Sequence, residues 1–529
     1  MLRRAWKPAL VISAPALGYL YYTREQTFDL PVRVRGSDGK ATMTTRTLPL
    51  LSMAAVDARI RQRAMENTVS RPGIVWHHTT ASVNANDPIE DATANQVIRR
   101  DEGDGDLLFF TVMDGHGGYY TSQLLSRVLI NAVALELSSL NKPASNAASG
   151  WLDGIKSALW GPPTASTAKS DVDIHISSDT ESPTTPRRPD ADPVRVARAI
   201  QTAFTSLDAE LIAAPLRVLA AALEQEKRQQ EHGDSRPQQA STRAARNASR
   251  NVRRAVAGVW EPDDAAEGKG RWRVEVLSED QTGRNPAELA RIQSEHPASE
   301  AADIIRNGRV LGGLEPSRAF GDARYKWSRG LQETLARAFL KGNDLSLRSP
   351  AALKTPPYVI ARPVVTHRVL NLPTNDGAVR KDKSALRFIV LATDGLWDEL
   401  SSEDVVRLVG GHLAGLSGAV PKSQLSTLVP TTTGAEAVEG KTARRQRMSD
   451  GAPEGQWAFV DENPSAHLIR NAFGGADTGA LRRLLSIPAP LARRHRDDVS
   501  VTVVWWEEAE GTPEVASLTI GRDEVKAKL

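Results

Sequence analysis

The chain has 529 residues, of which 40% are hydrophobic and 25% charged, so it holds enough apolar sequence for one large domain or several smaller ones. Lys and Arg number 67 against 64 Asp and Glu, and the resulting net charge of +3 argues against a dedicated nucleic-acid-binding protein. Cysteine is absent, which excludes disulfides, Cys-ligated zinc, iron–sulfur clusters and thiolate nucleophiles. An enzyme built from this chain must therefore use carboxylates, His, Ser, Lys or Arg.

The beginning of the chain combines basic and apolar side chains. Arg3, Arg4 and Lys7 precede an apolar run over residues 9–22, with no acid among them. The run is shorter than the roughly 20 residues that span a bilayer. We predict that residues 1–50 are a mitochondrial targeting region with weak membrane association through residues 9–22. The alternative is a terminus that frays without a function.

Apolar patterning predicts strands and helices mixed along the rest of the chain. In chain order they are a strand over 107–113, helices over 120–140 and 194–213, strands over 255–260 and 272–277, a helix over 287–293, strands over 364–370 and 388–393, helices over 403–413 and 466–473, and a strand over 499–506. Because the two kinds of element do not alternate regularly, we expect an α+β fold rather than a doubly wound parallel sheet.

Three stretches interrupt this pattern. Residues 161–193 are rich in Pro, Ser, Thr and Asp, residues 225–253 in Gln, Arg and Ala, and residues 413–455 in Gly, Ser and Thr. Such compositions cannot bury enough apolar surface to order a chain, so we expect low-complexity, disordered insertions. Without them, residues 51–510 amount to one domain, followed by a tail over residues 511–529.

The tail ends in Ala527-Lys528-Leu529, which differs by one residue from the Ser-Lys-Leu peroxisomal address. A match over three residues arises easily by chance. The peroxisome is therefore an alternative or second location beside the mitochondrion.

Acidic residues abut apolar runs or turns at four separate places. They are Glu90-Asp91, Asp114-Gly115-His116-Gly117-Gly118, Asp394-Gly395-Leu396-Trp397-Asp398 and Arg496-Asp497-Asp498. For any one Asp-Gly pair the alternative is a plain turn. Carboxylates that converge from separate strands repel one another unless a cation lies between them. Mg²⁺ and Mn²⁺ prefer such oxygen ligands, so the four segments together predict a divalent-metal centre.

The segments that begin at Asp114, Asp394 and Arg496 resemble, in type and order, the metal-binding motifs of the PP2C-type (PPM) protein phosphatases. Residues 312–322 resemble the family's Ser-Arg-Ala-(Phe/Ile)-Gly-Asp segment, and residues 199–211 resemble its long helix. The resemblance covers roughly residues 70–506. Residues 86–91 and 307–327 look most similar to the mitochondrial pyruvate dehydrogenase phosphatase-like branch. The implied fold is a four-layer α/β/β/α sandwich of two antiparallel sheets flanked by helices.

The resemblance also implies a phosphoserine/phosphothreonine phosphatase that holds two Mg²⁺ or Mn²⁺ ions and uses them to activate a water molecule. Its implied substrate is a phosphoprotein such as the pyruvate dehydrogenase complex, with no nucleic-acid partner. The implied metal residues are Glu90, Asp91, Asp114, Gly115 through its carbonyl, Asp394 and Asp497, with Asp398 either at a further weak site or capping a helix near Ser401. Asp114 would bridge the two ions as a catalytic residue, and His116 would protonate the departing Ser/Thr oxygen.

Two departures from the family pattern leave alternatives open. Asn86 stands where many members place a phosphate-binding Arg, so Arg318 and Arg324 are further candidates for holding substrate. Two central strands of the family are not recognisable before residues 255–260. The alternatives are a catalytically inactive binding scaffold, a hydrolase of small phosphoesters, or a misread exon over residues 214–254.

Overall fold

The computed structural model describes the following segments of the chain. They are 26–35, 41–71, 73–99, 105–140, 174–176, 192–232, 248–251, 254–263, 270–339, 349–370, 385–433 and 455–508. Residues 1–25 and 509–529 lie outside them, and so do the predicted membrane-associating run over 9–22 and the terminal Ala-Lys-Leu.

A seven-stranded sheet forms the centre of the fold. In spatial order its strands are β16 (Thr431–Thr433), β10 (Gly270–Val276), β9 (Arg254–Pro262), β14 (Ala385–Ala392), β18 (Val499–Glu508), β4 (Ile74–Val83) and β3 (Met65–Arg71). Each pair of neighbours is antiparallel except β16 with β10, which is parallel.

A second, narrower sheet faces the first and carries the glycine-flanked Asp114. It consists of β5 (Ala92–Arg99), β6 (Asp106–His116) and β8 (Ala248–Asn251). β6 is its middle strand, and Asp114 pairs with Arg250 of β8. Along the described part of the chain, β8 lies between α5 and β9. β5 pairs with residues 106–113 of β6 and β8 with residues 113–116, so the strand that leads into the predicted site is paired through to His116.

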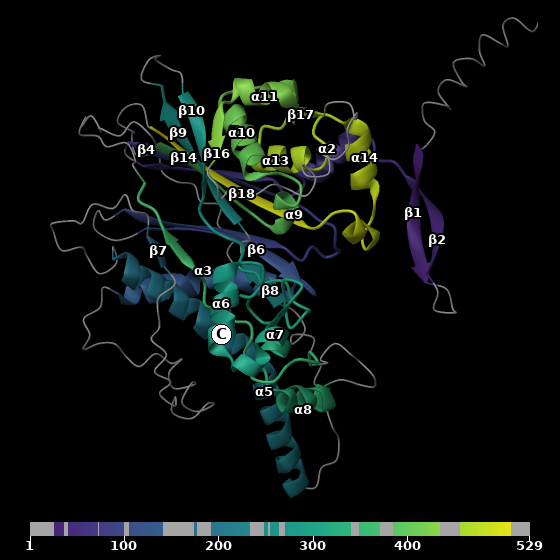
Figure 1. The fold of residues 1–529 in the computed structure, drawn as a ribbon, viewed down its shortest axis with the longest axis vertical. Helices are drawn as coiled ribbons and strands as arrows, with labels where there is room; N and C mark the ends of the chain where they lie inside the picture. The colour runs from purple at the N-terminus through teal and green to yellow at the C-terminus, as the bar shows by residue number, and fades with distance from the viewer. Residues whose placement is uncertain are drawn as a thin grey trace, which may run out of the picture.

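Helices cover the outer face of each sheet, which gives the expected four layers (Figure 1). On the larger sheet they are α2 (Met53–Arg61), α9 (Asp394–Trp397), α10 (Ser402–Leu413), α11 (Lys422–Leu428), α13 (Pro464–Ala472) and α14 (Thr478–Ser486). On the narrower sheet, α3 (Tyr120–Ser139) lies against all three strands and against α5 (Pro193–His232). Among the helices of the described segments, none is both long enough and apolar enough to cross a membrane.

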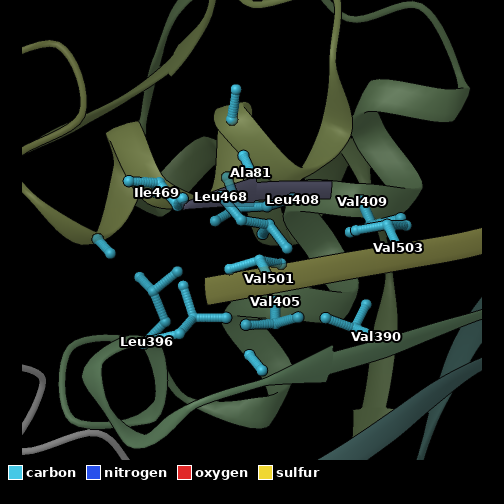
Figure 2. Packing of buried hydrophobic residues seen from close by; sticks show 14 of the residues in the cluster. Ala81, Val390, Leu396, Val405, Leu408, Val409, Leu468, Ile469, Val501 and Val503 are labelled. Carbon is cyan, nitrogen blue, oxygen red and sulfur yellow. The ribbon is translucent and has the colours of Figure 1, made fainter. Parts of the chain in front are cut away.

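The main hydrophobic core lies between the larger sheet and its helices (Figure 2). Val390 of β14 and Val501 and Val503 of β18 meet Leu408 of α10 and Leu468 of α13 there. Side chains of a strand alternate between its two faces, and β18 is buried on both because helices cover one face and the narrower sheet lies beyond the other. This double burial explains why β18 reads as a continuous apolar run.

Between β10 and β14 the chain forms an accessory segment with its own small core. It contains α6 (Pro286–Glu295), η4 (Ala298–Glu300), α7 (Ala301–Ile304), β11 (Ile305–Arg306), β12 (Arg309–Val310), η5 (Ala323–Tyr325) and α8 (Arg329–Phe339). Phe320 of this segment instead joins a cluster with α3, α5 and β6, so the segment is fixed to the narrower sheet.

Three two-stranded pairings and one short helix complete the described structure. They are β1 (Thr27–Arg35) with β2 (Ala41–Pro49), β7 (Ile174–Ile176) with β13 (Val365–His367), β15 (Gly418–Pro421) with β17 (Gln456–Phe459), and η7 (Leu491–Arg494). The β1–β2 hairpin projects from one side of the molecule (Figure 1).

Several element boundaries differ from the sequence prediction. The helix expected to end at residue 213 continues to His232 despite Pro215, so it enters the stretch expected to be an insertion over 225–253. The 413–455 stretch contains β15, α11 and β16. The strand expected over 364–370 is only the three residues of β13, and β3, β4 and β5 were not predicted. Most of 161–193 lies outside the described residues.

Candidate active site

The four acidic segments converge where the two sheets approach each other. Asp114 lies near the end of β6, Asp394 begins α9 directly after β14, and Asp497 lies shortly before β18. The backbone N–H of Asp394 lies 3.5 Å from the Asp114 carboxylate. Asp91 joins them, because it accepts hydrogen bonds from Gly115 N at 3.3 Å and from Thr393 Oγ1 at 2.9 Å. The structure thus brings together acids that are about 400 residues apart in sequence.

Two glycines make this convergence sterically feasible. A Cβ on Gly115 would lie 1.9 Å from the carbonyl oxygen of Glu90, and a Cβ on Gly395 would lie 2.2 Å from that of Asp498. Both distances are far below any real Cβ contact. In each Asp-Gly pair the glycine therefore lets a second acidic segment pack directly on the first.

Asp498 holds the loop that carries Glu90. Its buried carboxylate accepts from the backbone N–H groups of Ala85, Asn86 and Glu90 at 2.5, 2.9 and 2.8 Å. It also accepts from the side-chain amide of Asn86 at 2.9 Å. The sequence analysis names Asp497 but not Asp498 as a functional residue. The signal for Asp498 is its position beside Asp497, directly before β18.

Crowding of these carboxylates opposes their ionisation. Burial, followed by repulsion from Asp114 and Asp498, holds the pKa of Asp91 well above its usual range. Burial and the charge of Asp394 raise the pKa of Asp497 to about 6, although Arg493 acts in the opposite direction. Burial, reinforced by Asp498, also raises the pKa of Glu90.

This donor set fits a hard divalent cation. The converging groups are carboxylates, whose oxygens such ions prefer. The raised pKa values of Asp91 and Asp497 reflect burial first and then the negative charge of neighbouring acids, which a cation would compensate. Within the described segments, no three His, Asp or Glu side chains are already placed to enclose one ion. The acids are therefore grouped but not closed into a preformed cage.

One cationic side chain that the sequence analysis did not single out lies among these acids. Arg493 forms an ion pair with Asp497, and its pKa is raised by Asp497, Asp394 and Asp498 after the opposing effect of burial. Its side chain is 46% exposed, so the guanidinium lies between the acids and solvent. The run of arginines immediately before the acid pair was the signal in the sequence.

His116 follows Gly115 on β6 and is oriented by a different segment. Its Nε2 atom lies 3.2 Å from Oδ1 of Asp322, in the accessory segment. Its Nδ1 atom is buried and makes no hydrogen bond with any residue of the described chain. The expected proton donor therefore has one nitrogen held and the other unengaged.

The three predicted substrate-binding residues are engaged within the protein. The Asn86 amide points to Asp498 and to Glu90, the latter at 3.4 Å. Arg318 is buried and donates to Glu288 at 2.6 Å, and the Arg324 guanidinium lies 5.4 Å from the ring centroid of Tyr325. Their roles toward a substrate stay predictions.

Asp398 is placed at the end of α9, where its N–H donates to the Asp394 carbonyl. The following helix, α10, is capped by Ser401 and Asp404, which form a reciprocal capping box. Asp398 is therefore not the cap of α10, and its role at a metal site stays a prediction.

Comparisons with known proteins agree with this geometry. The family described as protein phosphatase 2C matches residues 267–419. A protein phosphatase 2C homologue of Schizosaccharomyces pombe is 32% identical over 458 residues, covering 86% of this chain and 85% of the relative. The mitochondrial pyruvate dehydrogenase phosphatase 1 of Saccharomyces cerevisiae is 29% identical over 88% of this chain and 75% of its own length. The human enzyme of the same name is 37% identical over 47% of this chain and 43% of its own length.

Proposed function

The chain belongs to the protein phosphatase 2C family of protein serine/threonine phosphatases, and we propose that it removes phosphate from a mitochondrial phosphoprotein with the help of two divalent cations. The observation that carries the proposal is the meeting of Asp91, Asp114, Asp394 and Asp497 at one place between the sheets.

We assign the metal-holding roles within this group as follows. Asp114, Asp394 and Asp497 would hold one cation. Asp114, the Gly115 carbonyl, and Glu90 with Asp91 would hold the other. When bound, Mg²⁺ or Mn²⁺ lowers the pKa of a bound water and neutralises charge on a phosphoryl group.

The chain's own residues supply positioning and a proton. Asp498 keeps Glu90 and the preceding loop in place through four hydrogen bonds. His116 would donate a proton to the departing serine or threonine oxygen, a role worth about 10²- to 10⁴-fold in rate. Because Asn86 faces the acids, we propose that the half-exposed Arg493 supplies positive charge at the entrance to the site.

The proposed location and substrate class rest on relatives. Two relatives carry names that place them in mitochondria and describe them as phosphatases of pyruvate dehydrogenase. A phosphorylated metabolic enzyme such as the pyruvate dehydrogenase complex is the corresponding proposal for this chain. The comparisons give no support to the peroxisomal alternative.

The inactive scaffold is the competing hypothesis, since the chain lacks recognisable sequence for two central strands. The structure favours catalysis over this alternative in one respect. β5 pairs with β6 as far as Met113 and β8 pairs with Met113–His116, so the acid-bearing end of the strand keeps a partner.

Release of phosphate from a phosphothreonine peptide by the purified chain, with and without Mn²⁺ or Mg²⁺, tests the proposal. We expect turnover that requires the cation and that Asp114→Asn abolishes. Asp303→Asn is the matched control. Asp303 is a half-exposed acid outside the group of converging carboxylates, and its ion-pair partner, Lys354, is also exposed. A folded protein without cation-dependent turnover would refute the proposal and favour the scaffold.

A further inference from the structure

We propose that Asp322 is a positioning residue that orients His116 for proton donation. The proposal rests on the proposed function, because it assigns a partner to the proton donor of that reaction. It adds a residue of the accessory segment to a site otherwise built from the two sheets.

The contact between the two side chains is close and sheltered. His116 Nε2 lies 3.2 Å from the Asp322 carboxylate, and the two side chains are only 18% and 8% exposed. A carboxylate that accepts from one imidazole nitrogen fixes both the ring orientation and which nitrogen carries that proton. Because Nε2 is held by Asp322, Nδ1 is the nitrogen that would donate a proton to the departing oxygen.

The environment of Nδ1 supports this assignment. Nδ1 is buried, yet no described residue hydrogen-bonds to it. A buried polar atom without a partner is costly, so such atoms call for an explanation. A substrate oxygen that accepts the Nδ1 proton would provide that missing partner.

The backbone around Asp322 is fixed independently of His116. Gly321 and Asp322 both adopt left-handed conformations, with φ of 68° and 45°. Asp208 of α5 accepts from Gly321 N at 2.7 Å and pairs with Lys326 at 2.6 Å. Lys326 also donates to the Ala319 carbonyl at 2.8 Å. The hydrogen bonds of Asp208 and Lys326 therefore hold the backbone of this turn in place.

The chemical step balances as follows. The oxygen of water forms a bond to phosphorus while the bond from phosphorus to the serine or threonine oxygen breaks. The departing oxygen keeps the electron pair of that bond and takes the proton from Nδ1. The step begins with the His116 imidazolium and leaves a neutral imidazole whose Nε2–H is still directed at Asp322. The proton that the attacking water loses as phosphate forms returns to Nδ1, so the imidazolium is restored.

The test compares two leaving groups. A serine or threonine alkoxide needs a proton as it departs, whereas p-nitrophenolate departs readily without one. We expect Asp322→Asn to lower kcat on a phosphothreonine peptide by about 10- to 100-fold, by analogy with the loss of a carboxylate that orients a metal-bound histidine. The fall on p-nitrophenyl phosphate should be clearly smaller, so the ratio of the two kcat values drops. Asn suits this position because it tolerates the left-handed backbone of Asp322.

Further variants separate positioning from folding. His116→Gln should change the ratio in the same direction, and the double variant should be no worse than His116→Gln alone. Asp303→Asn, in the same accessory segment, should keep the wild-type ratio. An unchanged ratio in folded Asp322→Asn, or losses that multiply in the double variant, would overturn the inference.

Failure of the inference can be distinguished from failure of the proposed function. If the wild-type chain hydrolyses neither ester, the proposed function fails; if it is active and the ratio is insensitive to Asp322, only the inference fails. If Asp322→Asn does not fold, the ¹⁵N spectrum of histidine-labelled wild-type protein decides, since the inference requires the Nε2 of His116 to carry a proton. A bare Nε2 would overturn it.

Discussion

Replacing Gly115 by alanine should disable the site while leaving the rest of the fold in place. The new Cβ would lie 1.9 Å from the Glu90 carbonyl oxygen, and real Cβ atoms essentially never approach closer than 3.0 Å. Glu90 and Gly115 must therefore separate by at least about 1 Å, which moves the acids on both segments. A misplacement of about 1 Å can cost roughly 10²-fold in rate.

Phosphopeptide turnover at saturating Mn²⁺ and calorimetric titration of Mn²⁺ measure the effect. We expect kcat to fall about 100-fold and the cation to bind more weakly, with the circular dichroism spectrum preserved. Gly330→Ala is the control, because a Cβ there meets nothing within 4 Å. Turnover of folded Gly115→Ala within threefold of wild type would refute the view that this close approach sets the geometry of the acids.

Three further predictions concern charge and packing. In metal-free protein, the pKa of Asp497 is about 6 in the folded state against an ordinary value of 3.8, so its ionisation lowers the free energy of unfolding as pH rises from about 4 to 6. Asp497→Asn should remove this decline and stabilise the metal-free chain at pH 7 by up to roughly 3 kcal/mol. Urea denaturation across this pH range measures the effect. Mn²⁺ at about 100 times its Kd should stabilise wild type by about 2.7 kcal/mol and raise its Tm, and an equal rise in Asp114→Asn would count against the metal site. Leu408→Ala, at a fully buried core position (Figure 2), should cost about 2–5 kcal/mol of unfolding free energy while kcat at 25 °C stays near wild type, and a loss below 1 kcal/mol would contradict the described packing.

Sequence patterning predicts the central strands, of which β18 is buried on both faces and β14 is buried on one face and half-buried on the other. β14 and β18 lie in the middle of the larger sheet, and their apolar runs identify them directly. β4 escapes the same reasoning because it carries buried polar side chains in its centre. Thr79, for example, is fully buried and hydrogen-bonds to Ser465 of α13 at 2.9 Å. Such a strand is stabilised by a partner that its own sequence does not reveal.

Local sequence also misjudges the length of α5. A proline within a helix usually ends it, since it removes one backbone hydrogen bond and crowds the preceding turn. Here the helix passes through Pro215 and continues for four more turns of mostly Ala, Leu, Glu and Gln, which are strong helix formers. The Gln- and Ala-rich composition that predicts an insertion after residue 225 therefore also favours a helix.

The acids of the candidate site could be predicted because each lies beside a strand or turn that the sequence marks. Arg493 follows no apolar run, and only the arginines around it mark its ion pair with Asp497, four residues on. Asp322 ends the family-like segment over 312–322, but its contact with the site could not be predicted because the partner is far away in the chain. Asp322 is paired with His116, about 200 residues earlier, by the packing of the accessory segment on the narrower sheet. Contacts of this kind depend on tertiary packing that no local pattern encodes.

The strand that carries Asp114 changes its neighbour just before that acid. β5 pairs with Asp106–Met113 of β6 and β8 pairs with Met113–His116, so the two pairings meet at Met113. A one-residue slip in the pairing of a strand exchanges the faces on which its side chains lie. Inserting or deleting one residue of β6 before Met113 would therefore turn the Asp114 carboxylate away from the other acids while leaving every acid in the sequence.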